Sequence, residues 1–202
     1  MKRKGDKTMS MLDFLKQRAT EAVKNSLKDA TKTVVNKAVT ESKTFTFQAL
    51  PTNVEELKAL PEASLDTPFK TAALTICALC AFRDDEKTGI DMLNFLKGPQ
   101  PLANRDIQFF HDVFRENKYV PISYFKGATP KNNYTQDQPY SLTIHTNTNS
   151  YQNEGYCTLW LKSGGADSER QIQLRKKGNQ WFLWEQFVMV GIRKAAADDP
   201  WA

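Results

Sequence analysis

The cysteine pair Cys77 and Cys80 has the two-residue spacing of redox-active and metal-binding cysteines. Activating a thiol requires a helix N-terminus or neighbouring cations, whereas this pair lies inside the apolar run 72–82. A metal site would need a second pair of ligands, which the remaining Cys157 does not supply. The sequence therefore predicts thiols that pack in the core, no metal, no disulfide framework and a reducing, cytoplasmic environment.

Acid–base chemistry would depend on one of two histidines, His111 on a predicted helix and His145 on a predicted strand. No Gly-x-Ser-x-Gly motif supplies a nucleophile for either. The acidic cluster 84–86 does not have the spacing of a calcium loop, and the loop 163–166 precedes a strand instead of the helix N-terminus that binds phosphate. No cofactor and no catalytic residue is predicted, and an enzyme that uses His145 is the second hypothesis.

The strongest candidate for a binding site is one face of a predicted antiparallel sheet. Residues 141–147, 156–162, 170–176 and 180–187 alternate between aliphatic side chains and a mixture of aromatic and polar ones. With a hairpin loop at Gly178 and Asn179, Arg175 opposes Phe182 and Gln173 opposes Trp184. The aliphatic face then packs on helices, and the other face carries the aromatic residues Tyr156, Trp160, Phe182 and Trp184 together with Arg175.

Two interpretations of this aromatic face remain open. The C-terminal segment 188–202, or the segment around Phe45, covers it, which is the commoner situation because most aromatic side chains are structural. Alternatively, a ligand or partner covers it, since large exposed apolar patches are rare on monomers. The functional hypothesis depends on the second interpretation.

The elements that position this face follow from the hydrophobic periodicity. It predicts helices at 54–60, at 69–83, at 88–97, and from Pro101 or Asn104 to Asn117, of which 69–83 is apolar on most sides and thus central. The period changes to two after Tyr119, and residues 45–47 have the pattern of a short strand. The order of elements predicts an α+β fold, with helices on one face of an antiparallel meander of about four strands.

The net charge of +5 is not spread over the chain. Residues 1–43 hold eleven Lys/Arg and five Asp/Glu, whereas residues 44–202 hold seventeen and eighteen. We therefore expect two parts: a basic amphipathic helical segment at 1–43 and one globular domain at 44–202. For the helix, protein contact or self-association ranks first, the membrane surface second and nucleic acid third, because the domain adds no wider basic surface. No apolar run is long enough to cross a bilayer.

Several stretches resemble an uncharacterised bacterial family of unknown function, over about residue 63 to the C-terminus. The stretches are 67–73, 93–102, 123–130, 132–135, 153–156, 163–168, 180–185 and 199–202. The resemblance implies an intracellular bacterial protein and supplies no activity, ligand or site. The order of helices and strands is also similar to that of NTF2-like folds, in which a curved sheet encloses a pocket.

The leading hypothesis is a non-enzymatic binding module that recognises a protein partner or a small ligand. Aromatic side chains would supply contact area and Arg175 a fixed charge. The candidate residues come from the sheet face and from the loop 127–139: Tyr156, Trp160, Arg175, Phe182, Trp184, Asn132, Asn133 and Tyr134.

Overall fold

The computed structural model describes residues 40–200. The predicted basic helix, and with it the predicted association with a partner or a membrane surface, falls almost wholly on residues 1–39, outside the described part. The strand β1, Ser42–Phe47, begins two residues before the predicted start of the globular domain at 44. Glu41 also belongs to the folded part, since its backbone N–H donates to Thr146 Oγ1 at 2.8 Å.

The helices begin and end at the expected local signals. They are α2 (Val54–Ala59), α3 (Pro68–Asp84), α4 (Glu86–Lys97) and α5 (Asn104–Glu116). Asn53 and Asp85 cap α2 and α4 by accepting from backbone N–H groups, as such side chains do at helix starts. Helix α4 stops at Gly98, whose φ of 60° favours glycine. The predicted helices are therefore all present, with ends that differ by one or two residues.

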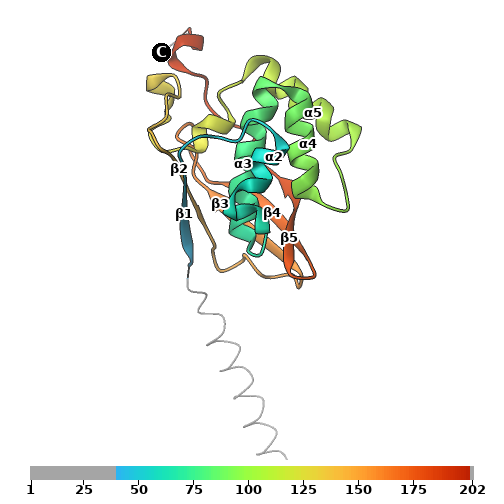
Figure 1. Cartoon of the computed structure of the whole chain (residues 1–202). Coiled ribbons are helices and arrows are strands. Elements are labelled where there is room, and N and C mark those ends of the chain that lie inside the picture. The colour runs from blue at the N-terminus through green and yellow to red at the C-terminus, as the bar shows by residue number, and fades with distance from the viewer. Residues whose placement is uncertain (1–39, 201–202) are drawn as a thin grey trace, which may run out of the picture. The chain divides into compact units, whose positions relative to one another are not determined.

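Helix α3 lies at the centre of the domain (Figure 1). Fourteen of its 17 residues are buried because it contacts the sheet through β2–β5 and contacts α4 as well. At its C-terminal end Phe82 packs against Phe110 and Phe114 of α5, with ring centroids 5.4 Å apart in both pairs. A helix that is apolar on most sides must be covered on most sides, and this one is.

The sheet has five strands in the order β1-β2-β3-β4-β5, and every neighbouring pair is antiparallel. The strands after β1 are β2 (Tyr140–His145), β3 (Tyr156–Leu161), β4 (Arg170–Lys177) and β5 (Gln180–Gln186). The predicted α+β class is confirmed, with β1 added to the four-strand meander at the edge beside β2. No described helix is long and apolar enough to cross a membrane.

The register of the last hairpin corrects one predicted pairing. Arg175 pairs with Phe182 and Leu174 with Leu183, as expected, but Gln173 pairs with Glu185 instead of Trp184. A bulge places one extra residue on β5 at this point, and such a bulge cannot be recognised from alternation alone. The bulge decides which way the last residues of β5 point.

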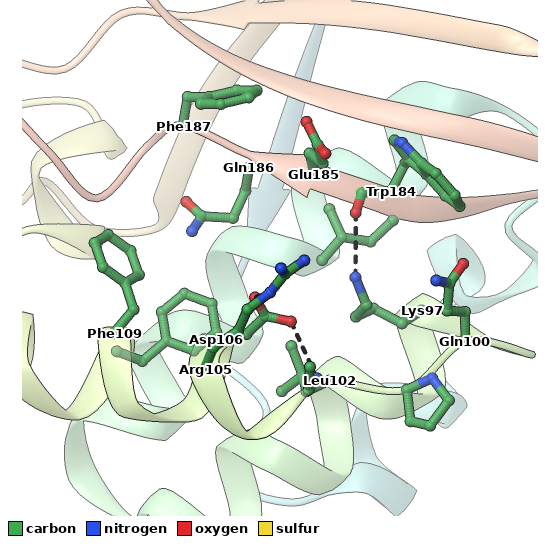
Figure 2. A pocket seen from close by; sticks show the side chains of 14 residues that line it. Lys97, Gln100, Leu102, Arg105, Asp106, Phe109, Trp184, Glu185, Gln186 and Phe187 are labelled. Carbon is green, nitrogen blue, oxygen red and sulfur yellow. Dashed lines mark hydrogen bonds and ion pairs between the residues drawn. The ribbon is translucent and has the colours of Figure 1, made fainter.

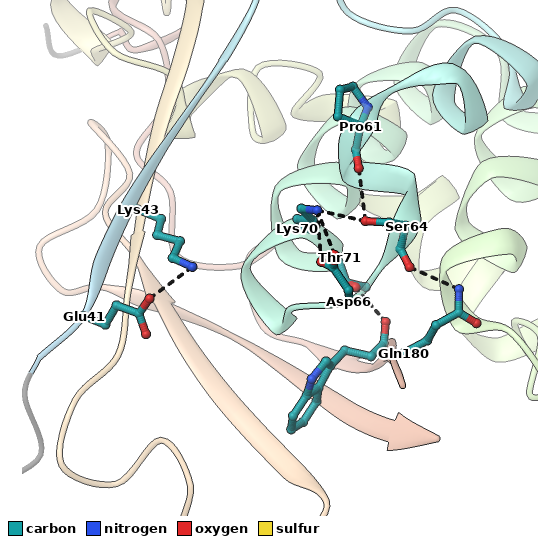
Figure 3. A network of polar contacts seen from close by, with 9 residues as sticks. Glu41, Lys43, Pro61, Ser64, Asp66, Lys70, Thr71 and Gln180 are labelled. Atoms are coloured by element: carbon teal, nitrogen blue, oxygen red, sulfur yellow. Dashed lines mark hydrogen bonds and ion pairs between the residues drawn. The ribbon is translucent and has the colours of Figure 1, made fainter. Parts of the chain in front are cut away.

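A network of polar contacts fastens the start of β5 to the helices (Figure 3). Thr71 Oγ1 of α3 donates to the carbonyl oxygen of Trp181 at 2.6 Å, and the Trp181 N–H donates to the Leu65 carbonyl at 2.8 Å. Gln180 Nε2 donates to the Ser64 carbonyl at 3.2 Å. The outward backbone groups of this edge strand are thus satisfied within the domain at this end, which protects the edge from pairing with other chains.

The three thiols are buried and unpaired by disulfides. Burial raises the pKa of Cys80 and of Cys157 to about 12, and it also raises the pKa of Cys77. We expect none of them to react with iodoacetamide in the folded protein at pH 8, because the reaction needs an accessible thiolate. All three should react in denaturant, as measured by intact mass, and alkylation of the folded chain at a cysteine would contradict the placement.

Candidate functional site

The two faces of the sheet differ in burial as well as in chemistry. Leu159 and Leu161 of β3, and Ile172 and Leu174 of β4, are buried on the side that packs on the helices. The residues between them are half-buried or exposed. We call this second side the open face; its residues on the central strands are Tyr156, Thr158, Trp160, Gln171, Gln173 and Arg175.

Three of the predicted site residues form one contact group on the open face, which we call the ring cluster: Tyr156, Arg175 and Trp184. Arg175 lies with its guanidinium carbon 4.6 Å from the ring centroid of Trp184 and 5.4 Å from that of Tyr156. The two rings meet edge to face at a centroid distance of 5.7 Å. These cation–π contacts favour the observed orientations of both rings, each contributing about 0.5–1 kcal/mol at exposed sites.

Trp160 lies further along β3, at a hollow of about 210 Å³ that we call the amide trough. Its walls come from β3, from β4 and from the loop that joins β2 to β3. They are Asn149, Ser150, Gln152, Asn153, Tyr156, Thr158, Trp160, Gln171 and Gln173. Tyr156 belongs to both the trough and the ring cluster, so the two form one continuous surface.

Phe182 is placed at the margin of this surface. It pairs with Arg175, but its ring packs against the C-terminal end of α4, so closely that a Cβ added to Gly98 would lie 2.3 Å from the ring. Phe182 thus helps to attach the edge strand to the helices. Its contact also explains why α4 ends in a glycine.

The three loop residues of the prediction are engaged elsewhere. Tyr134 is 3% exposed, stacks on Tyr119 at 4.6 Å and donates from its hydroxyl to the Arg193 carbonyl at 2.6 Å. Asn132 bonds within its own loop, donating to the carbonyls of residues 127 and 135. Asn133 Oδ1 accepts from the N–H of residue 197 at 2.8 Å. The structure does not bring these side chains to the ring cluster; Asn132 holds its own loop, and Asn133 and Tyr134 hold the C-terminal segment.

The segments that were expected to cover the aromatic face have other contacts in the described part of the chain. The C-terminal segment is held by Tyr124, whose hydroxyl donates to the Val188 carbonyl at 2.7 Å, and by Arg170, which donates to the carbonyls of residues 190 and 191. Phe45 of β1 pairs with the buried Leu142 and packs against the core. Neither set of contacts involves the open face.

The histidine of the enzyme hypothesis has an acidic neighbour. His145 is opposite Trp160, and its Nε2 lies 3.0 Å from Glu169 Oε2, with the His145 side chain 24% exposed. A catalytic pair also needs a cavity that holds a substrate against it. Neither residue lines the trough, the hollows at β5 beside Lys97, or the hollow beside Asp137.

A larger groove of about 460 Å³ runs between β5 and the N-terminal half of α5 (Figure 2). Phe109 and Phe187, 38% and 49% exposed, come from its two sides. Lys97 Nζ donates to the Trp184 carbonyl at 3.1 Å, and burial lowers the pKa of this ammonium group. Arg105 and Glu185 add charges of both signs, so the groove has no single electrostatic character.

Sequence reasoning missed the loop that closes one side of the trough. The run Asn147–Asn153 holds three asparagines and a glutamine, and this composition was the available signal. Gln171 and Gln173 alternate with the buried Ile172 and Leu174, which places them on the open face, but only the fold shows that the loop lies beside them. The trough is therefore a product of tertiary structure.

Comparisons with known proteins identify a family but no activity. The model of a domain of unknown function, DUF6935, matches residues 49–196. No curated protein and no solved structure matches the chain. The similarity to NTF2-like folds stays a prediction.

Proposed function

Because the chain belongs to the DUF6935 family of domains of unknown function, we propose a function from its own geometry: a non-enzymatic binding module that recognises its ligand through the open face. The observation that carries this proposal is the ring cluster beside the amide trough. Three large aromatic side chains, Tyr156, Trp160 and Trp184, lie half-buried on a sheet face whose described surroundings leave them accessible. Aromatic groups held in this way dominate the energetics of recognition surfaces.

The fixed geometry of the cluster supports recognition over a purely structural role. Arg175 favours one orientation of both rings before any ligand arrives, which reduces the rotamer entropy lost on binding. The sheet below is rigid, because β3 pairs with β4 along its whole length and both strands pack on α3. Binding sites on such scaffolds are preorganised, and preorganisation raises affinity.

The experiment uses the full chain with labelled tryptophan side chains, whose four indole N–H signals are followed by NMR. Two probes are added separately: a mixture of neutral oligosaccharides and a random decapeptide library. We expect the signals of Trp160 and Trp184 to shift with one probe. Trp181 is the internal control because it points to the helix side, where it packs against the core.

Single Trp→Phe substitutions assign the four signals. Loss of the shift in the Arg175→Ala variant would support the ring cluster as part of the surface, since the arginine orients both rings. The proposal fails if neither probe moves Trp160 or Trp184, or if Trp181 alone responds.

A further inference from the structure

We infer that the amide trough binds a neutral saccharide, an inference that rests on the proposed function and names its ligand class. The chemistry of the walls is the first argument. None of the nine lining residues carries a charged side chain; five are amides, two are hydroxyl residues and two are aromatic. A site without Lys, Arg, Asp or Glu offers no ion pair to a phosphate, a carboxylate or an ammonium group.

Side-chain amides match sugar hydroxyls. A hydroxyl both donates and accepts a hydrogen bond, and an amide presents a donor and an acceptor side by side, so neighbouring hydroxyls can bond to both ends of one amide. Gln171 and Gln173 are two positions apart on β4, hence on the same face and about 7 Å apart. The trough can therefore meet more than one hydroxyl group at a time.

The side-chain amides of Gln171 and Gln173 are also available to a ligand. Among the described residues their side chains make no hydrogen bond to the protein, in contrast to Asn132 and Asn133, whose amides hold the backbone. On the loop side, Gln152 Nε2 donates to Asn149 Oδ1 at 2.9 Å and so fixes the orientation of that wall. One wall is thus preorganised, and the other has its hydrogen-bonding groups available.

The aromatic residues provide the surface against which a sugar ring lies. Trp160 and Tyr156 are four positions apart on β3, about 13 Å, and the small Thr158 between them leaves the hollow. The aliphatic C–H groups of a pyranose pack on an aromatic ring by dispersion and weak C–H contacts. The separation of the two rings favours an oligosaccharide over a monosaccharide, with one sugar in the trough.

Two other classes of ligand fit less well. Strand addition by a peptide needs free backbone groups at a sheet edge, whereas β3 and β4 are interior strands. Single-stranded nucleic acid needs cations along its stacking platform; the trough walls have none, and Arg175, Lys176 and Lys177 line a separate hollow beside Trp184. The volume of the trough, about 210 Å³, is also below the roughly 300–1,000 Å³ of sites that enclose drug-sized ligands, which agrees with a single sugar unit in the trough.

The test is isothermal titration calorimetry of the full chain with three neutral tetrasaccharides: maltotetraose, cellotetraose and chitotetraose. Tetragalacturonate is the negatively charged counterpart. We expect at least one neutral probe to bind and the uronate to bind more weakly. Trp160→Ala and Gln173→Ala should each weaken binding about tenfold or more, the effect typical of central contact residues. Gln48→Ala, an exposed amide in the turn after β1 that lines neither the trough nor a hollow beside the ring cluster, is the matched control and should leave the affinity within about twofold.

Circular dichroism shows whether each variant is folded, and Gln173→Glu serves as a second variant of nearly unchanged shape. It replaces two donors by a negative charge and should also weaken binding of the neutral probe. If only the decapeptide library shifts the Trp160 and Trp184 signals, the saccharide inference fails and the binding-module proposal stands. If a tetrasaccharide binds but Trp160→Ala and Gln173→Ala leave its affinity unchanged, the trough is not its site.

Discussion

Replacing Gly89 with alanine is expected to lower the free energy of unfolding by roughly 2–3 kcal/mol, the upper part of the range for overpacked positions. A Cβ at this position would lie 2.2 Å from the Cα and Cβ atoms of Phe82, and 2.6 Å from its backbone nitrogen. These atoms belong to the neighbouring helix α3 and cannot rotate away. Helices α3 and α4 would have to separate at the point where Phe82 also packs on α5.

The sign of this effect is informative because helix propensity acts in the other direction. Alanine is favoured over glycine in a helix interior by about 1 kcal/mol, so without the contact the substitution would stabilise the protein. Urea denaturation of the full chain measures the difference. Glu86→Ala, at an exposed position in the first turn of the same helix, is the control and should change stability by less than about 0.5 kcal/mol. A rise in the midpoint for Gly89→Ala would show that the two helices do not approach so closely.

Replacing Tyr134 with alanine is expected to cost about 3–5 kcal/mol, as for other large buried aromatic residues. The ring is almost wholly buried, lies parallel to that of Tyr119 and is covered by Gly165, where an added Cβ would come within 1.9 Å of the hydroxyl oxygen. The substitution also removes the hydrogen bond to the Arg193 carbonyl. Loss of these contacts should release the C-terminal segment as well as lower the thermal midpoint.

Tyr134→Phe separates the two contributions. It keeps the stacked ring and removes only the hydroxyl, so we expect a smaller cost of about 1–2 kcal/mol for the unpaired carbonyl. Because Tyr134 contacts Tyr119 and Arg193 and not the trough, Tyr134→Phe should leave tetrasaccharide affinity unchanged. If this folded variant lost binding, the loop 127–139 would have to be part of the recognition surface.

The hydrophobic period was enough to determine the elements and the two faces of the sheet. The helix 68–84 was recognisable because its apolar residues recur on most sides, which only a central position satisfies. The opposite character of the two sheet faces followed from strict alternation, which places Leu159 on one side and Trp160 on the other whatever the rest of the fold does. Burial of Cys77 and Cys80 followed from the same apolar pattern.

Tertiary structure decided which of the candidate residues meet. The bulge in β5 places Glu185 opposite Gln173, and the alternation of apolar and polar residues along the strand does not indicate this bulge. The polar loop 127–139 predicts that Tyr134 is a recognition residue, yet this side chain is buried by Tyr119 and by the C-terminal segment, which is distant in sequence. Local patterns show which side chains are apolar and at what spacing they recur. Contacts between residues that are distant in sequence depend on the tertiary fold instead. For that reason the aromatic face was evident from the sequence, whereas the amide trough beside it exists only in the folded protein.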